Sequence, residues 1–184
     1  MPMRHSVVFA ALVFAASPVR AQQPAATLAT DVPVGFELWS ADHVKEVSDR
    51  LEKNIGNKDI LFETMGNWKG HSVYLVLRAT TADAEFHQTE EDLYFGVRGN
   101  ATFLIGGEMV DSKRMPRKQM RSATIRGGAN RELHAGDVVY VPRAVPHQIV
   151  LAPGERFMYF LIKLDEEPLQ NLNPHTLTPE KKKQ

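Results

Sequence analysis

Short apolar runs separated by turn residues fill most of this 184-residue chain, and they limit the folds that it can adopt. From residue 71 onward the runs are rich in β-branched and aromatic residues, a composition typical of strands. Glycine or proline stands at most of the joints between the runs. Short strands at close spacing predict an all-β sandwich or barrel. The expected strands cover residues 71–80, 84–88, 93–98, 101–105, 138–141, 148–151 and 157–164.

One helix is expected before the strands, over residues 40–55. Ser40 can cap its first turn, and Gly56 can end it. Between them, apolar side chains repeat at helical spacing, at Val44, Val47, Leu51 and Ile55. The sequence therefore predicts an all-β domain with one N-terminal helix.

The first 21 residues have the pattern of a signal peptide. Arg4 and His5 precede a ten-residue apolar run, and the small residues up to Ala21 form a cleavage site. The run is shorter than the about 20 residues that a membrane span needs. Its flanks favour a signal peptide over a buried N-terminal helix. We therefore expect a periplasmic or secreted protein with no membrane span after cleavage.

The mature chain is expected to hold one domain with two loose ends. Residues 22–35 are mostly small and polar, which predicts a flexible lead-in. Residues 36–167 would form the single β-barrel domain. Residues 168–184 end in a run of charged residues, which predicts a mostly disordered tail.

The composition excludes several kinds of site. The chain has no cysteine, which rules out disulfide frameworks, thiolate zinc sites, iron–sulfur clusters and cysteine nucleophiles. Its 22 basic residues balance 22 acidic ones, and a net charge of zero argues against a nucleic-acid-binding protein. It also lacks the G-x-S-x-G motif of many serine hydrolases.

Candidate metal ligands lie in residues 84–99. In a strand, Glu85 and His87 point to the same face because side chains alternate. Asp92 returns to that face if the next strand pairs with the first as a hairpin, so that three donor groups converge. A register slip of one residue would select Glu91 instead of Asp92.

His147 is the candidate fourth ligand. It follows a strand and a proline-bounded turn, and it starts another strand. A metal ion needs ligands from separate elements that a rigid scaffold holds in place. A turn between two strands can provide such a position.

Tyr94 and Gly96 share the parity of Asp92, so both are expected to face the same pocket. Tyr94 offers a hydroxyl and is the candidate catalytic residue. The alternative is that Tyr94 only packs inside the barrel. Gly96 would leave room for a ligand. The opposite face of this strand is expected to carry Leu93, Phe95 and Val97.

The first of these segments resembles the first motif of the cupin superfamily, which is H-x-H, four residues, E, six residues and G. Here the order is Glu85-x-His87, four residues, Asp92, six residues and Gly99. Every spacing holds, but Glu85 stands where the first histidine is usual and Asp92 stands where glutamate is usual. Carboxylates are competent metal ligands, so four donors remain.

The second segment resembles the second cupin motif, which is G, five residues and P-x-G-x-x-H. Here it reads Gly136, five residues and Pro142-x-Ala144-x-x-His147, with alanine in place of the turn glycine. The resemblance implies a double-stranded β-helix, which is a jelly-roll barrel with a metal near its mouth. It also implies a homodimer. The metal ligands that it implies are Glu85, His87, Asp92 and His147.

The bound metal would be a divalent ion, with Mn, Fe, Zn and Ni as the candidates. Oxygen ligands favour Mn²⁺ or Fe²⁺, whereas the general affinity order favours Zn²⁺. A small organic molecule would bind beside the metal. The residues leave open whether the site performs dioxygenation or the enolate chemistry of an isomerase or epimerase.

A metal-free alternative uses the same residues. Glu85 and Asp92 would then be neighbouring carboxylates, and the pKa of one of them should rise. Such a pair suits acid–base chemistry. The chain could also be a non-catalytic module that binds a small molecule or a sugar, with its carboxylates only hydrogen-bonded.

A basic insert lies between Asp111 and Glu132, with seven cationic residues and no acidic one. We expect a long loop that acts as a lid or binding element and attracts an anionic group of the ligand. The alternatives are a solvated loop and a dimer contact. The cationic residues of the insert are Lys113, Arg114, Arg117, Lys118, Arg121, Arg126 and Arg131.

Overall fold

The computed structural model describes residues 32–167. The predicted signal peptide, most of the predicted lead-in and the predicted tail lie outside these residues. The chain divides into two compact units after Leu38, and the helix and all described strands belong to the second unit. No helix within residues 32–167 is both long enough and apolar enough to cross a membrane.

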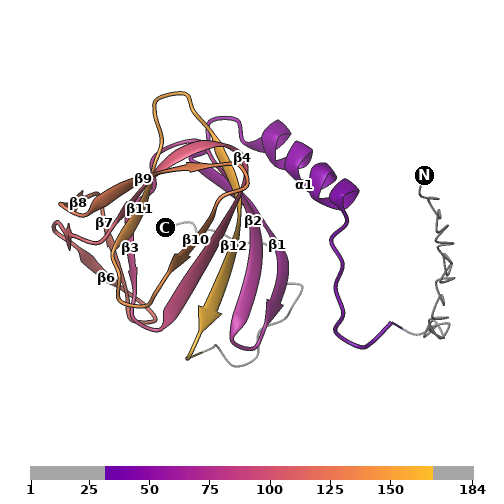
Figure 1. The fold of residues 1–184 in the computed structure, drawn as a ribbon, viewed down its shortest axis with the longest axis horizontal. Helices are drawn as coiled ribbons and strands as arrows, with labels where there is room; N and C mark the ends of the chain where they lie inside the picture. Colours follow the sequence, from indigo (N-terminus) through magenta and orange to yellow (C-terminus); the bar gives the residue numbers. More distant parts are fainter. Residues whose placement is uncertain (1–31, 168–184) are drawn as a thin grey trace, which may run out of the picture. The chain divides into compact units, whose positions relative to one another are not determined.

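The helix α1 (Ala41–Asn54) confirms the predicted helix. Ser40 caps it, because its side chain accepts a hydrogen bond of 3.2 Å from the backbone N–H of His43. One face of the helix is buried and packs against the sheet (Figure 1). Val47 and Leu51 of the helix, and Ile55 directly after it, form one cluster with Leu75, Leu77 and Met158 of the sheet.

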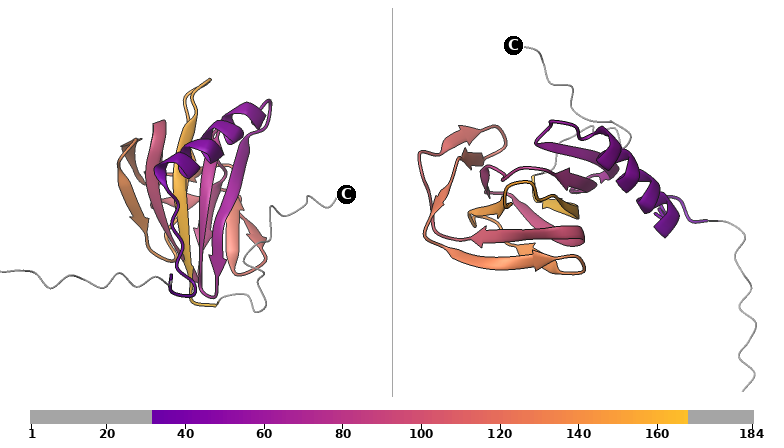
Figure 2. Two further views of the ribbon diagram at one scale, coloured as in Figure 1. Left: turned by 90° about the vertical axis from the view of Figure 1, so that its right-hand side faces the viewer. Right: turned by 90° about the horizontal axis from the view of Figure 1, so that it is seen from above.

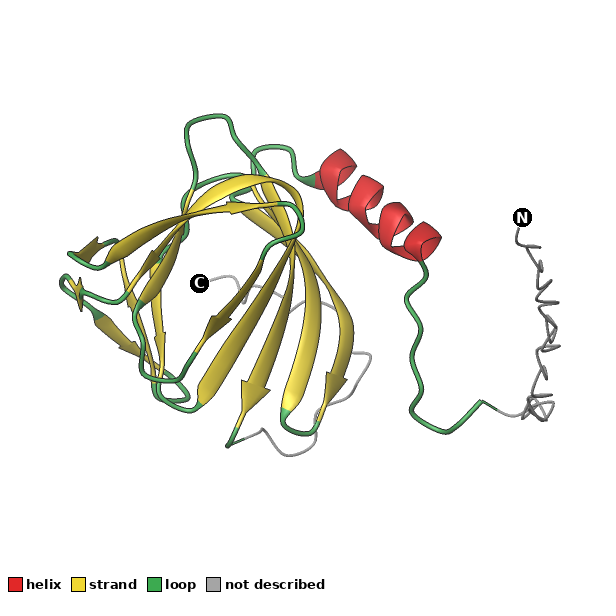
Figure 3. Cartoon of the chain, in the orientation of Figure 1, coloured by secondary structure: helices red, strands yellow, loops and turns green. Residues whose placement is uncertain are grey.

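The remaining elements are strands, which confirms the predicted all-β class with one helix (Figure 3). The strands are β1 (Ile60–Trp68), β2 (His71–Arg78), β3 (Ala84–His87), β4 (Glu90–Ile105), β5 (Glu108–Met109), β6 (Lys113–Met115), β7 (Gln119–Ser122), β8 (Ile125–Arg126), β9 (Ala129–His134), β10 (Val138–Val141), β11 (His147–Val150) and β12 (Phe157–Asp165). Of these, β1, β9 and the four short strands β5 to β8 were not among the expected strands, because polar residues interrupt their apolar pattern.

Ten of the described strands form one large antiparallel sheet in the order β1-β2-β12-β4-β11-β3-β7-β6, with β9 and β10 joined to β4, and β5 and β8 pair as a separate two-stranded sheet. The long strand β4 takes part in both halves of the large sheet. Its first half pairs with β10 and β12, and its second half pairs with β9 and β11. The sheet therefore folds over at β4 and curls around an interior (Figures 1 and 2). This arrangement agrees with the predicted jelly-roll barrel.

The prediction of two strands over residues 93–98 and 101–105 was wrong, because β4 runs through both. The joint between them is Gly99, which has a left-handed φ of 80°. A side chain at this position would overlap the carbonyl oxygen of Arg156. Glycine here bends the strand against its neighbour instead of ending it.

The hairpin between residues 84–88 and the next strand, given above as the condition for Asp92 to join Glu85 and His87, does not form. β3 pairs with β7 and with β11, and no pairing joins it to β4 within the described residues. Only Gln88 and Thr89 separate the two strands, so the chain crosses from one half of the sheet to the other there. Partners that are distant in sequence take the place of the expected hairpin.

The prediction that the basic insert forms a long loop was wrong as well. Most of the segment lies in β6, β7, β8 and the start of β9. β7 extends the sheet beside β3 by pairing Glu85 with Arg121 and His87 with Gln119. The insert is therefore part of the wall that carries the predicted metal ligands.

Candidate metal centre and its cavity

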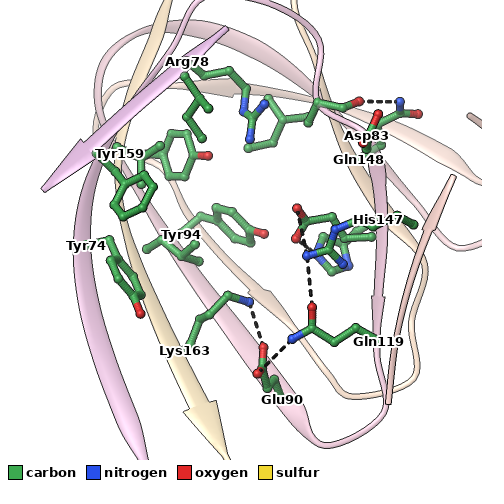
Figure 4. A pocket seen from close by; sticks show the side chains of 18 of the residues that line it. Tyr74, Arg78, Asp83, Glu90, Tyr94, Gln119, His147, Gln148, Tyr159 and Lys163 are labelled. Atoms are coloured by element: carbon green, nitrogen blue, oxygen red, sulfur yellow. Dashed lines mark hydrogen bonds and ion pairs between the residues drawn. The ribbon is translucent and has the colours of Figure 1, made fainter. Parts of the chain in front are cut away.

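A cavity of about 940 Å³ lies between the two halves of the sheet. Alternation along the strands decides which side chains line it. β2 contributes Tyr74, Val76 and Arg78, and β12 contributes Tyr159, Leu161 and Lys163. Of the candidate metal ligands, Glu85 and His147 line the cavity, and Figure 4 shows His147 together with polar groups around it.

The four predicted metal ligands converge on one point. One ligand atom from each of Glu85, His87, Asp92 and His147 lies within 4.8 Å of all the others. Three of the residues are buried, and Glu85 is half-buried. The prediction that these side chains come together is confirmed, although the hairpin expected to do so does not form.

Two contacts between distant segments bring the ligands together. His147 pairs directly with Glu85 across β11 and β3. The backbone N–H of Ala144 donates a hydrogen bond of 2.8 Å to the carbonyl oxygen of His87. Ala144 has a left-handed φ of 58°, the conformation for which the usual motif carries glycine. The turn before His147 is thus tied to the end of β3.

The imidazole of His147 is held in the orientation of a metal ligand. Its Nδ1 donates to the carbonyl oxygen of Val145 at 3.0 Å. A carbonyl oxygen can only accept, so Nδ1 carries a proton and Nε2 is the nitrogen that can offer a lone pair to a metal. Nε2 is buried, has no hydrogen-bond partner and lies 3.4 Å from Oδ2 of Asp92. This is the arrangement in which metal-binding histidines are usually found.

The donor atoms are spaced to fit a cation. The Nε2 of His87 lies 3.1 Å from a Glu85 oxygen and 3.4 Å from Oδ2 of Asp92. The Nε2 of His147 lies 3.9 Å from the same oxygen of Glu85. With bonds of about 2.1 Å, the ligand atoms around a tetrahedral or octahedral cation are about 3.0–3.4 Å apart. The residues present therefore fit a metal ion.

Lys163 is a member of this site that the sequence reasoning missed. Its ammonium lies 2.7 Å from Oδ1 of Asp92, 3.2 Å from a Glu90 oxygen and 3.3 Å from Nε2 of His87. The sequence did contain an indication of this role. Side chains alternate along a strand, so Lys163 points to the same face as Tyr159 in an otherwise apolar run. A fixed cation therefore lies beside the candidate ligands.

Glu90 was also missed. It is 3% exposed, and its carboxylate lies 3.6 Å from Nδ1 of His87, beyond hydrogen-bond distance. Lys163 and Arg117 contact the same carboxylate, and Gln119 donates to it at 3.1 Å. Glu90 thus lies on the Nδ1 side of the His87 ring, opposite the other candidate ligands.

The basic insert contributes two cations to the cavity wall. Arg117 lies 3.0 Å from Glu90, and Arg121 lies 3.6 Å from Glu85. Arg117 lies in the turn between β6 and β7, and Arg121 lies in β7. A role of the insert in ligand binding stays a prediction. Its other cationic residues, Lys113, Arg114, Lys118, Arg126 and Arg131, are exposed, as is Arg117.

The pKa values of both candidate carboxylate ligands are lowered. Burial alone would raise the pKa of Glu85, but the hydrogen bond with His87 and the charge of Arg121 lower it to about 2. Burial also opposes the charge of Asp92, and Lys163 and the two histidines hold its pKa well below the usual range. The expected rise in one pKa in the absence of metal was wrong, because cations surround both groups.

The cationic groups of the cluster shift in the opposite direction. Burial would lower the pKa of His87, but the hydrogen bonds with Asp92 and Glu85 raise it. Burial would likewise lower the pKa of Lys163, and Asp92 and the neighbouring glutamates raise it. The metal-free cluster is therefore a set of mutually paired ions.

Tyr94 lines the cavity as expected and is 3% exposed. Its hydroxyl donates to Oδ2 of Asp92 at 3.1 Å, and burial followed by the charge of Asp92 raises its pKa well above the usual range. The hydroxyl thus contacts the oxygen nearest to the two histidines. A catalytic role for Tyr94 stays a prediction.

Two neighbours of these residues have other roles. A side chain at Gly96 would overlap the carbonyl oxygen of His134, so glycine permits close approach of two backbones and does not leave room for a ligand. Glu91, the competing ligand, pairs with Arg143 at 3.2 Å and is not among the grouped ligands. The register is therefore the one that selects Asp92.

Comparison with known proteins returns solved structures, some of which are named as cupins. A cupin 2 conserved barrel domain protein from Salinispora arenicola is 21% identical, with a TM-score of 0.40, and the match covers 58% of this chain and 76% of that one. A cupin superfamily protein from Desulfitobacterium hafniense is 18% identical, with a TM-score of 0.43, over 59% and 80% of the two chains. A protein from Thermus thermophilus is 11% identical, with a TM-score of 0.46, over 64% and 93%.

No protein-family profile and no curated protein matches the chain. The site is assigned from the residues of this chain. In the spacing of both motifs, the chain resembles the cupin superfamily.

Proposed function

We propose that the protein binds a divalent metal ion through Glu85, His87, Asp92 and His147, and a small organic molecule in the adjoining cavity. The observation that carries the proposal is the state of His147. Its Nε2 is buried without a hydrogen-bond partner, and its Nδ1 is bonded to a backbone oxygen that turns Nε2 toward the carboxylates. Buried polar atoms normally have a partner, and a bound cation would be the partner of this lone pair.

Two imidazoles and two carboxylates suit Mn²⁺, Fe²⁺, Zn²⁺ or Ni²⁺. When bound, the metal would act as a Lewis acid on an oxygen-bearing ligand, which suits oxygenase or isomerase chemistry. The chain's own part is to hold the ligand set, and Tyr94 would orient Asp92 within it.

Export and dimer formation belong to this proposal as well. Export rests on the signal-like pattern of residues 1–21, and the homodimer rests on the family resemblance alone. Fractionation of the natural host's cells and light scattering of the purified protein test them.

Metal analysis of the purified full-length protein tests the metal site. We expect about one divalent ion per chain in the wild type and much less in Glu85→Ala and His147→Ala. His134→Ala is the matched control, because His134 is exposed on β9 and outside the ligand group. Equal metal content in wild type, His147→Ala and Glu85→Ala would contradict the proposal.

A second candidate function is favoured by Lys163. Its ammonium already neutralises Asp92 and Glu90, as expected in a metal-free module that only binds a small molecule. In that case the wild type would contain no stoichiometric metal after incubation with each of the four candidate ions. Its thermal unfolding would also be unchanged by those ions, whereas a bound metal would raise the midpoint.

A further inference from the structure

Arg78 ends β2 and projects into the cavity at a place apart from the metal ligands. In Figure 4 it lies across the open space from Lys163 and Glu90. Tyr74 and Val76 precede it on the same face of the strand. The guanidinium therefore closes the end of a row of aromatic and apolar side chains.

The guanidinium of Arg78 is incompletely satisfied. Its Nε is buried and has no hydrogen-bond partner among the described residues. The two other arginines of the cavity wall, Arg117 and Arg121, are paired with Glu90 and Glu85. Asp83, a further acid on the cavity wall, is exposed and makes no ion pair with Arg78.

Within residues 32–167, Arg78 is the one arginine that is neither exposed nor ion-paired. Arginine stays protonated in proteins, so this charge cannot be relieved by loss of a proton. Arg78 is half-buried, and a charge partly removed from water without a paired counterion is unfavourable, so a fixed cation at a cavity end favours an anion there. The cavity thus presents a cationic group with which no described carboxylate forms an ion pair.

We propose that Arg78 binds the carboxylate of an organic ligand whose body extends through the cavity toward the metal centre. The planar fork of one guanidinium matches one carboxylate through two parallel hydrogen bonds. Tyr74, Tyr159 and Leu161 line the space beside it and would contact an apolar or aromatic body. This inference names a ligand class for the proposed function and rests on it, but its central contact does not involve the metal.

Calorimetric titration of the full-length protein tests the subsite, with and without prior chelation of metal. The probes are benzoate and 3-phenylpropanoate, each compared with its neutral primary amide. We expect each carboxylate to bind about tenfold or more tightly than its amide, because a hydrogen bond to a charged group is stronger than a neutral one. Arg78→Gln should remove this difference, and Arg78→Lys should keep part of it.

The matched control is Arg156→Gln, since Arg156 pairs with Glu52 outside the cavity lining. It should keep the full preference for carboxylates. Thermal unfolding separates binding from a structural role. In the absence of ligand, Arg78→Gln should unfold at the wild-type temperature or above it, because it removes an unpaired charge. The carboxylate-induced rise in that temperature should disappear.

Three results would overturn the inference. They are a preference for carboxylates that survives in Arg78→Gln, no binding of either carboxylate to the wild type at millimolar concentration, and inorganic phosphate binding more tightly than both at Arg78. Metal content is measured in the same samples. Loss of metal from the wild type with an intact carboxylate preference would count against the metal centre and leave the Arg78 subsite standing.

Discussion

The ammonium of Lys163 lies 2.7 Å from Oδ1 of Asp92, while the second oxygen of that carboxylate lies 3.4 Å from Nε2 of His147. One buried carboxylate thus stands between a fixed cation and the space that fits a metal ion. The ammonium compensates the carboxylate when no metal is bound, and it repels a divalent ion when one enters. Lys163 should therefore weaken metal binding and stabilise the metal-free protein.

Lys163→Met is expected to tighten metal binding about tenfold, because the repulsion between the ammonium and a nearby divalent ion would cost about 1 kcal/mol or more. The metal-free variant should lose about 3 kcal/mol in the free energy of unfolding, since its buried carboxylates lose their partner. Competition with a chelating dye measures the affinity, and urea unfolding measures the stability. Lys118→Met is the control, because Lys118 is exposed and pairs with Glu167 at the surface. Weaker metal binding in Lys163→Met would contradict this account.

Tyr94→Phe removes the hydroxyl that donates to Oδ2 of Asp92. We expect metal affinity to fall by about tenfold, as for other groups that orient a metal ligand. The free energy of unfolding should fall by about 1 kcal/mol. Tyr74→Phe removes a hydroxyl from the same cavity away from the ligands and should leave metal affinity unchanged. If both variants bind metal like the wild type, Tyr94 does not position Asp92.

The stability of the metal-free protein should fall toward both ends of the pH range. The pKa of Glu85 is lowered from 4.5 to about 2, so its contribution is present above pH 4.5 and is lost as the pH falls toward 2. The pKa of His87 is raised from 6.5, so its contribution is present below pH 6.5 and is lost as the pH rises through the raised value.

Bound metal should remove the loss at high pH, because the ion takes the place of the proton on His87. Urea unfolding across this pH range, with metal or chelator present, checks both limbs. Glu85→Gln should flatten the acidic limb only. A metal-free protein whose stability keeps rising with pH beyond neutrality would show that His87 is not the titrating group.

Gly99→Ala should destabilise the protein by about 3 kcal/mol or more, because the backbone strain of a left-handed φ and a steric overlap of the new side chain add together. The position has a φ of 80°, and a side chain there would meet the carbonyl oxygen of Arg156. Gly136→Ala is the comparison, since Gly136 has a φ of 93° and open space around it. It should cost about 1–2 kcal/mol from conformation alone. Equal losses in the two variants would show that the contact with Arg156 is unimportant.

Ala144→Gly should stabilise the protein by about 1 kcal/mol, because Ala144 has a left-handed φ of 58°. The gain from relieved strain is partly offset by the larger entropy of the unfolded glycine chain. Thermal and urea unfolding measure the change, and metal content should stay as in the wild type. Ala152→Gly, outside the left-handed positions, should be neutral or destabilising. Destabilisation by Ala144→Gly would mean that the turn prefers alanine for its contacts.

Much of the ligand set follows from the sequence because its cause is local. Alternation along a strand places Glu85 with His87 and Tyr94 with Asp92, whichever strands lie beside them. Helix α1 was equally predictable, since its cap, its apolar spacing and its end are all encoded within one segment. Such features need no knowledge of distant partners.

The remaining features depend on long-range pairing, which local patterns do not encode. β3 pairs with β7 and β11 rather than with β4, so the basic insert became part of the cavity wall. Lys163 and Arg78 reach the cavity from strands whose other inward residues are apolar or aromatic. A single charged residue on the inward face of such a strand indicates a functional site. The residues that it contacts can be identified only from the folded sheet.

The imidazole of His147 is aimed by the main-chain oxygen of Val145. That oxygen is present whatever amino acid occupies position 145, so the aim of the ring depends on the path of the turn and not on the identity of a neighbouring side chain. Residues of this turn can therefore be substituted without changing the orientation of the ring, provided that the backbone path of the turn is kept. In proteins that descend from this chain, we expect the residues of the turn to change sooner than the orientation of Nε2 of this histidine.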